Sequence, residues 1–430
     1  MALLERLQQI VAAVGTDGTF TSGNMIAGNA KYKIFEPRPA YNVGQFERQP
    51  YRATIGAIAN VPGARYVEFT FNTEVNGSGT PGVAPVIGPL LRACGFSETA
   101  STGSAAISGV TADPNNLTPA TVPTVTGTYA HTVSGRMIIS VTAIVTDTSL
   151  NFSVEWRRNG TASQFYEGES QTGATGVTLS GGALDGVIVD FGNPDTDTDL
   201  HRVGDKYYIT LTSDQQVDVK YKPISDSIPC LDFGLYQNGR RHTAHSCRGN
   251  VQLVASAIGQ PMIANWRFMG IINDIADAAL MSNPAYENIV APPFIGVGTT
   301  IGGTTPQCFN NISIDMGNNV QLRECATSAT GYSTGRIGSR RVTMSINPLG
   351  ALVATTDPWS DLFDGTTRAF HFDIGETAGN IVEVDAVRAQ TTGITVGERA
   401  GDIEDARTML FTEPEYDAGG DYAEIELTFR

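Results

Sequence analysis

The stretch from Ala64 to Thr99 places the strongest constraint on the fold of this chain. It begins with a run in which polar and apolar residues alternate (ARYVEFTFNTEV) and continues through a loop rich in glycine and proline (NGSGTPGVAP). It ends in a short, helix-like apolar run (VIGPLLRACGFSET). A period of two is that of a β-strand with one buried face. We therefore expect Val67, Phe69 and Phe71 to point into a core.

The composition favours β-structure along the whole chain. Of the 430 residues, 47 are glycine and 21 are proline, and only 17% are charged, below the usual share of about a quarter. Such a chain is expected to be all-β with many strand ends, and it is long enough for two or three domains. The net charge of −16 disfavours a surface that grips nucleic acid, because phosphate binding requires Lys and Arg. It is compatible with simple solubility, or with a surface that nucleic acid passes without adhering.

Changes in composition and strand pattern along the chain predict four segments. Met1–Val14 resembles a short amphipathic helix and precedes a Gly/Thr/Ser/Asn-rich leader. Residues 31–39 are expected to form a strand that Pro37 and Pro39 stop. Short strand patterns at regular spacing, in a region rich in Thr, Ser, Gly and Asp, predict a small β-sandwich inserted between the two pieces of a first domain. The segments are an N-terminal arm (1–30), a first domain in two pieces (31–105 and 217–290), the insert (106–216) and a second domain (291–430).

The second domain repeats the plan of the first. Four pairs of blocks occur in the same order: KYKIFEPRPAYNVGQFER with NISIDMGNNVQLRE, VPGARYVEFTFN with RIGSRRVTMSINP, GPLLRACGF with DPWSDLFDG, and SCRGNVQLVASAIGQ plus MIANWRFMG with VEVDAVRAQTTGITVG plus ARTMLFT. Duplicated β-modules in one chain pack against each other to bury their apolar faces. The last strand, AEIELTFR, also alternates.

Catalytic and metal-binding patterns are weak. His242 and His245 lie beside Cys247, but on a strand residues three apart point to opposite faces, so we expect polar surface histidines rather than a metal site. The acidic run NPDTDTD lacks the glycine and closing glutamate of a calcium loop. No GxSxG or GxxxxGK[ST] motif is present. We expect no cofactor, no metal and no enzymatic activity.

Cysteine content and hydropathy place the chain in a reducing, aqueous setting. The five cysteines are scattered without a CxxC pair, which predicts free thiols rather than a disulfide framework. No apolar run approaches the length that crosses a bilayer, so we expect no membrane partner.

The motifs quoted above resemble a known family. VEFTFNTEVNGSGTPGVAPVIGPLLRACGFSET is similar to the central motif of bacteriophage tail tube (major tail) proteins of long-tailed phages. NGRRHTAHSCRGNVQL, CFNNISIDMGNNVQLRE and GNIVEVDAVRAQ resemble later blocks of that family more loosely. The region 106–216 has no counterpart in compact members, and RIGSRR stands where the family usually has an aspartate-arginine turn.

The resemblance implies a structural virion protein that is assembled in the host cytoplasm and stacks as rings into a tube. DNA would pass through its channel without specific binding, because a negative wall repels phosphate. Two tube-like β-sandwich or barrel domains per chain imply homotrimeric rings of six similar units, with a homohexamer as the alternative. The implied further partners are the tape-measure protein and the tail terminator and distal tail proteins.

The resemblance also implies roles for particular residues. The candidate channel-lining carboxylates are Glu68, Glu74, Glu424 and Glu426, with ordinary solvent exposure as the alternative. The candidate inter-ring loop, expected to lack stable structure in the free chain, comprises Asn76, Gly77, Ser78, Gly79 and Gly82.

A different function class stays open at this point. The chain is alternatively a β-rich adhesin of a virion or cell surface whose insert grips a carbohydrate. In that case Trp156, Tyr166 and Tyr207 would stack on sugars, although core packing is the commoner fate of such aromatics.

Overall fold

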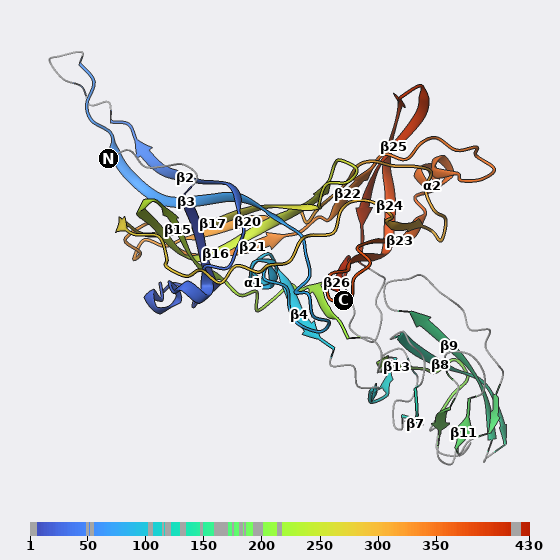
Figure 1. Cartoon of the computed structure of the whole chain (residues 1–430). Helices are drawn as coiled ribbons and strands as arrows, with labels where there is room; N and C mark the ends of the chain where they lie inside the picture. Colours follow the sequence, from blue (N-terminus) through green and yellow to red (C-terminus); the bar gives the residue numbers. More distant parts are fainter. Residues whose placement is uncertain are drawn as a thin grey trace.

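A computed structural model describes most of the chain and confirms the all-β class. Strands dominate, and two short α-helices and two 3-10 turns, η1 (Ser22–Asn24) and η2 (Ala27–Asn29), complete the regular structure of the described part. Figure 1 shows an elongated molecule with a smaller body attached at one end. The described residues are 7–48, 51, 56–101, 106–113, 116, 122–129, 135–146, 149–158, 171–173, 176–179, 184, 186–191, 201–212, 217–413 and 423–430.

A 15-stranded antiparallel sheet forms the main body and contains two units with the same strand order. The first unit runs β1 (Gln8–Val14), β15 (Leu231–Gln237), β16 (Gly239–Ala255), β17 (Ile263–Ala278), β3 (Val61–Glu74), β2 (Phe35–Phe46). The second runs β18 (Gly298–Ile301), β23 (Thr367–Ile374), β24 (Val382–Arg399), β25 (Asp402–Phe411), β22 (Thr343–Ile346), β19 (Ile312–Asp315). Three further strands continue from β24: β26 (Glu426–Phe429), β14 (Val219–Pro223) and β4 (Phe96–Ala100).

The pairing registers of the two units share one irregularity. In the first unit Phe233 on β15 lies opposite Ala244 on β16, directly beside a register shift. In the second unit Phe370 on β23 lies opposite Ala386 on β24, again beside a shift. A β-bulge in the same place in both units sets the same local bend. The two halves therefore share their strand order and this irregularity.

Each unit also carries one short helix at the equivalent point of the chain. The helix α1 (Gly88–Ala93) follows β3 and has a proline in its first turn, as predicted. The helix α2 (Pro358–Asp364) follows β22, and Asp357 caps it by accepting a hydrogen bond from Ser360 N. A separate two-stranded sheet, β20 (Asn319–Glu324) with β21 (Tyr332–Ser339), lies between β19 and β22 in the chain.

The two units are joined edge to edge by one antiparallel pairing. The end of β16, residues 252–255, pairs with β19, residues 312–315, so that Leu253 lies opposite Ile314. Both side chains are buried in a single apolar core that extends through both units. The joint is thus a continuous sheet over a shared core rather than a loose contact between two bodies.

The centre of this core is aromatic. Phe69 stacks on Phe233 with ring centroids 4.8 Å apart, and Trp266 stacks on Phe268 at 6.0 Å. Val67, Phe69 and Phe71 are each 1% exposed, so the alternating strand predicted from Ala64 onward faces inward as expected. Such rings bury large apolar areas, which contribute about 25 cal/mol per Å².

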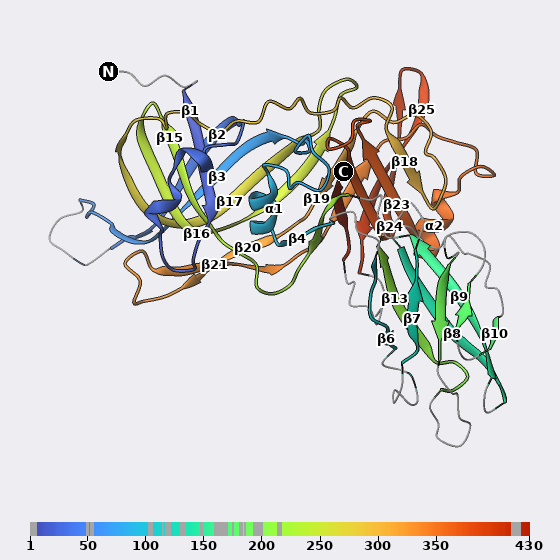
Figure 2. The same ribbon diagram turned by 60° about the horizontal axis from the view of Figure 1, so that its bottom comes forward.

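The predicted insert forms two sheets with their own core, seen at the lower right of Figure 2. It leaves and rejoins the main sheet at neighbouring points, where Ser101 N donates to Asp218 O (2.8 Å) and β4 pairs with β14. Its strands are β5 (Ala106–Ile107), β6 (Thr111–Ala112), β7 (Thr124–Gly127), β8 (Gly135–Thr146), β9 (Ser149–Arg158), β10 (Gln171–Gly173), β11 (Val177–Thr178), β12 (Val187–Asp190) and β13 (Lys206–Thr212).

Two local predictions are wrong. The described part of Met1–Val14 is the strand β1, not a helix, because it pairs along its whole length with β15 and buries Ile10, Val11 and Ala12. A sheet position among buried strands overrides local helix propensity. Residues 8–14 therefore do not belong to a free arm. The strand predicted to stop at Pro37 and Pro39 instead continues to Phe46.

Candidate assembly site

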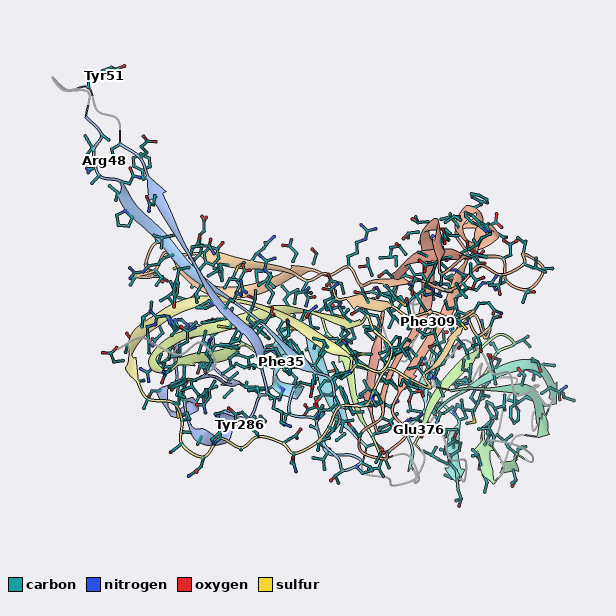
Figure 3. The ribbon with its side chains drawn as sticks, turned by 45° about the horizontal axis from the view of Figure 1, so that its top comes forward. Phe35, Arg48, Tyr51, Tyr286, Phe309 and Glu376 are labelled. Carbon is teal, nitrogen blue, oxygen red and sulfur yellow. The ribbon has the colours of Figure 1, made fainter. Side chains whose placement is uncertain are left out.

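The β2–β3 hairpin projects from the main body. Figure 3 shows it extending away from the body toward Arg48 and Tyr51 near its tip. Every residue of β2 is exposed or half-buried. Its apolar side chains include Tyr41, Val43 and Phe46, which are 38%, 44% and 69% exposed. A run of exposed large apolar residues on a projecting strand marks an interaction surface.

The outer side of β2 is an open sheet edge. β2 is the terminal strand of the main sheet and pairs with β3 alone among the described strands. The backbone of Pro39 faces this open side. Val75 N donates to Met262 O (2.9 Å), so odd-numbered residues of β3 turn their backbone polar atoms toward β17. Phe69 is one of these residues and lies opposite Pro39, so the two form a non-hydrogen-bonded pair, and the backbone polar atoms of Pro39 turn away from β3. Proline is tolerated there because no N–H is required.

A second open edge lies in the second unit, along the last residues of β24. β23 covers one side of β24 only as far as Gln390, and β25 and β26 lie on the other side. Residues 391–399 therefore have no strand partner on the β23 side within the described part of the chain. Val396 lies opposite Asp405, and Glu398 lies opposite Ile403. Asp405 N donates to Pro348 O and Ile403 O accepts from Gly350 N, both on the side of β25 away from β24. The backbone polar atoms of Val396 and Glu398 therefore face the open side of β24.

The predicted channel-lining carboxylates lie in two different settings. On β3, Glu68 pairs with Arg267 (2.7 Å), whose side chain is 62% exposed, and Glu74 is half-buried. The two glutamates near the start of β26, Glu424 and Glu426, lie in a different setting. Glu424 is buried and receives three hydrogen bonds from the Arg340 guanidinium, the shortest of 2.8 Å. Its charge is already balanced within the chain.

Glu426 is likewise held in the interior. Lys220 lies 2.6 Å and Lys222 3.1 Å from its carboxylate oxygens. Burial opposes ionisation of Glu426, but the two lysines outweigh it and lower its pKa to about 2. Alternation in AEIELTFR suggested a polar face for these glutamates, yet β26 is buried on both faces. Glu424 and Glu426 thus serve as internal ion-pair partners, and this placement does not favour the channel-lining role for them.

The predicted inter-ring loop is tied to the second unit of its own chain. Gly77 N donates to Asn380 Oδ1 and Gly79 N donates to Gly379 O, both at 2.9 Å. A Cβ on Gly77 would lie 2.0 Å from Gly379 O, so only glycine fits. Asn76, Ser78 and Gly82 belong to the same packed segment. The expectation of no stable structure in the free chain is therefore wrong for this loop.

His242 and His245 contact different partners, and the expectation of surface histidines is wrong: His242 is buried and His245 is half-buried. His242 accepts from the Tyr41 hydroxyl through Nδ1 and donates to Gln237 Oε1 through Nε2 (3.0 Å). Burial lowers the pKa of His242 and that of His245, which favours neutral rings. His242 therefore connects the projecting hairpin to β15 and β16.

Among the described residues, three potential metal ligands come together elsewhere, at His371, Glu383 and Asp385, whose ligand atoms lie within 4.8 Å of one another. His371 Nδ1 donates to Asp385 Oδ1 (2.8 Å) and Nε2 donates to Asp373 Oδ1 (3.1 Å). These hydrogen bonds raise the pKa of His371 to about 10. A protonated imidazole therefore supplies the positive charge that balances these acids.

The aromatic residues considered for sugar binding do not form an exposed platform. Tyr207 is fully buried and its hydroxyl bonds to His201 Nδ1 (2.8 Å). The side chain of Trp156 and the whole of Tyr166 lie outside the described residues. This arrangement gives the adhesin alternative no support from Tyr207.

All five cysteines are free thiols: Cys94, Cys230, Cys247, Cys308 and Cys325. The first three are buried, and burial raises the pKa of each of these thiols, as expected for inert core residues. Within the described residues, no helix has the length and apolar character needed to cross a membrane.

Comparison with known protein families relates the chain to one of them. The family model described as phage tail tube protein matches residues 168–430, more than half of the chain. No curated protein matches the chain. The matched region includes all of the second unit and the β15–β17 strands of the first.

Proposed function

Because the chain belongs to the phage tail tube protein family, we propose that this structural tail protein forms rings that stack into a hollow tube. The observation that carries the proposal is the duplicated sheet, in which two like units are joined edge to edge and each has an open edge, on β2 and on β24. Open edges expose unpaired N–H and C=O groups, which favour pairing with another chain. A closed ring of sheets satisfies both edges.

The same observation favours three chains per ring. Each chain supplies two similar units, so three chains supply six, and a single ring closes with alternating joints within and between chains. A homohexameric ring remains the alternative and would contain twelve units. Open edges at opposite ends of the molecule, on β2 and on β24 (Figure 1), suit a head-to-tail ring rather than a two-fold dimer.

The channel of this tube would carry phage DNA without binding it. The net charge of −16 supports such a role, since like charge repels the phosphate backbone. Glu68 and Glu74 on β3 are the better candidates for the channel wall, because Glu424 and Glu426 are neutralised inside the chain. We infer no catalytic role and no cofactor.

The insert, with its separate core, would decorate the tube exterior. Tubes of this kind would be assembled in the host cytoplasm and reside in the virion tail. They would contact a tape-measure protein along the channel, and a tail terminator and a distal tail protein at the two ends.

Electron microscopy of the purified protein tests the proposal. We expect rings or tubes of uniform bore, with three copies of the insert around each ring. Six inserts per ring would contradict the trimer but retain the tube. Isolated particles at all concentrations would contradict tube formation itself.

A further inference from the structure

The joint inside the chain provides a template for a joint between chains. In the first unit, β16 continues beyond its partner β15, and residues 252–255 accept the first strand of the second unit, β19. In the second unit, β24 continues in the same way beyond its partner β23, but its last residues meet no strand there. The strand equivalent to β19 in the first unit is β2, whose outer edge is also open.

The registers define which residues are equivalent. Phe268 on β17 lies opposite both Phe69 and Gly249. Met409 on β25 lies opposite both Met344 and Thr391. The sequence repeat, which aligns VEFTFN with VTMSIN, also matches Phe69 with Met344.

Following each strand outward from these anchors gives the equivalents of the joint residues. Leu253 corresponds to Val396, because their β17 and β25 partners are equivalent. Ile314 corresponds to Pro39, because these two residues lie opposite Met344 and Phe69.

We infer that β2 of one copy of this chain pairs antiparallel with residues 394–396 of β24 in the next copy. Pro39 lies opposite Val396 and Tyr41 opposite Ile394, in the register of Leu253 with Ile314. The inference rests on the proposed ring and names the surface that closes it.

The backbone atoms point the right way on both strands. Within the chain, Met316 N donates to Val251 O (3.1 Å), which makes Leu253 and Ile314 a hydrogen-bonded pair. The polar atoms of Val396 face the open side of β24, and those of Pro39 face the open side of β2. Val396 N can therefore donate to Pro39 O, and the next pair, Tyr41 with Ile394, can exchange two hydrogen bonds.

The side chains also match the internal template. Leu253 and Ile314 are 5% and 2% exposed, since the internal joint covers them. Their equivalents are open in the isolated chain: Val396 is 57% exposed, and Tyr41, on the same face of β2 as Pro39, is 38% exposed. Pairing of the two edges would cover these apolar groups in the same way.

At the equivalent position of the two joints, the open edge of β2 has a proline and the paired strand β19 does not. Pro39 stands where the internal joint has Ile314. Without an N–H, this edge accepts hydrogen bonds at Pro39 but does not donate one, so two β2 edges cannot form a full ladder with each other. The edge of β24 does supply a donor at Val396. This difference favours pairing of β2 with β24 over pairing of β2 with itself.

A disulfide tests the register. Ala40 and Thr395 form the non-hydrogen-bonded pair of this joint, and both are exposed in the isolated chain. Such pairs bring Cα atoms to about 4.5 Å, within disulfide range. In a Cys308→Ser/Cys325→Ser background, the Ala40→Cys/Thr395→Cys variant is assembled, oxidised and run on non-reducing gels. We expect dimers and trimers linked by disulfides.

Two controls isolate the geometry. Asn42→Cys/Thr395→Cys shifts one cysteine by two residues, to a diagonal separation of about 7–8 Å, and should cross-link poorly. Val254→Cys/Ser313→Cys places the pair in the internal joint, where Val254 lies opposite Ser313, and should form a disulfide within one chain.

The outcomes separate this inference from the proposed function. Tubes without the Ala40–Thr395 cross-link, or with stronger cross-linking in the shifted variant, overturn the strand register while the tube proposal stands. Cross-linked trimers that never stack support the joint and contradict the tube. Concentrated protein that yields neither cross-links nor rings contradicts both.

A charge placed in the joint gives an independent readout. Val396→Asp should abolish ring formation while leaving the urea unfolding midpoint of the isolated chain unchanged, since Val396 is 57% exposed there. Ile403→Asp, on the neighbouring strand at 65% exposure, is the matched control and should still form rings. Normal ring formation by Val396→Asp would overturn the inference.

Discussion

The ion triad of Glu426 with Lys220 and Lys222 allows a quantitative test of how the strands beside the insert are held to the second unit. Glu426→Gln keeps the size of the side chain and removes its charge. Lys220, whose side chain is 15% exposed, then loses its closest counter-charge at 2.6 Å. Breaking a buried pair by removing one partner typically costs about 3–5 kcal/mol.

The pKa of Glu426 gives an independent value. It is lowered from 4.5 to about 2, which corresponds to about 3 kcal/mol of folding free energy at neutral pH. The carboxyl pKa is depressed in the folded state, so this contribution is present above the unfolded pKa and is lost as the pH falls toward 2. The difference between wild type and Glu426→Gln should therefore shrink from about 3 kcal/mol at pH 7 to about 1.5 kcal/mol at pH 3.

Urea unfolding of the unassembled chain at both pH values, followed by tryptophan fluorescence and circular dichroism, measures this difference. Glu68→Gln is the control, because its partner Arg267 is 62% exposed and such pairs contribute about 1 kcal/mol or less. The reasoning fails if Glu426→Gln costs no more than Glu68→Gln at pH 7. It also fails if the cost of Glu426→Gln is the same at both pH values.

Two other predictions concern the loop and the insert. Gly77→Ala should destabilise the chain by about 1–3 kcal/mol and expose the loop to proteolysis, because its Cβ would meet Gly379 O at 2.0 Å; Gly23→Ala, with no atom within 4 Å, should change neither quantity. Replacement of residues 106–212 by a short Gly/Ser linker should leave tubes intact but narrower in micrographs, since the insert has its own core and its ends are adjacent. Failure of the shortened chain to assemble, with unchanged unfolding of the main sheet, would contradict an exterior insert.

Local periodicity predicted much of this fold. The alternating strand with Phe69 and Phe71, the proline-initiated helix α1, and the insert as a separate β-unit follow from patterns within a few residues of each other. The repeat was visible because matched blocks preserve the order of strand, loop and helix. These features depend on neighbours in the sequence, so the sequence alone contains the signal.

Features set by distant partners could not be predicted in this way. β1 is a strand because β15 lies beside it, although the two are more than two hundred residues apart in sequence. Glu426 is an internal ion because Lys220 approaches it from β14. Pro39 suggested a strand end, but it marks the open side of an edge strand. That proline is a sequence signal for the proposed assembly edge, and only the pairing register shows its meaning.

Duplication within one chain changes how such a ring would form. The joint of β16 with β19 lies between segments of one polypeptide, so its formation is independent of protein concentration, and the linker between them fixes a high effective concentration. The proposed equivalent joint between chains would be bimolecular and would contain a proline, which removes one hydrogen bond from its ladder. Half of the joints in a six-unit ring would then be complete before assembly, while the other half would control when it occurs. Edge protection is needed only on the strands that would meet between chains. Pro39 occurs on β2 at the position where β19 has Ile314, and this difference follows that division.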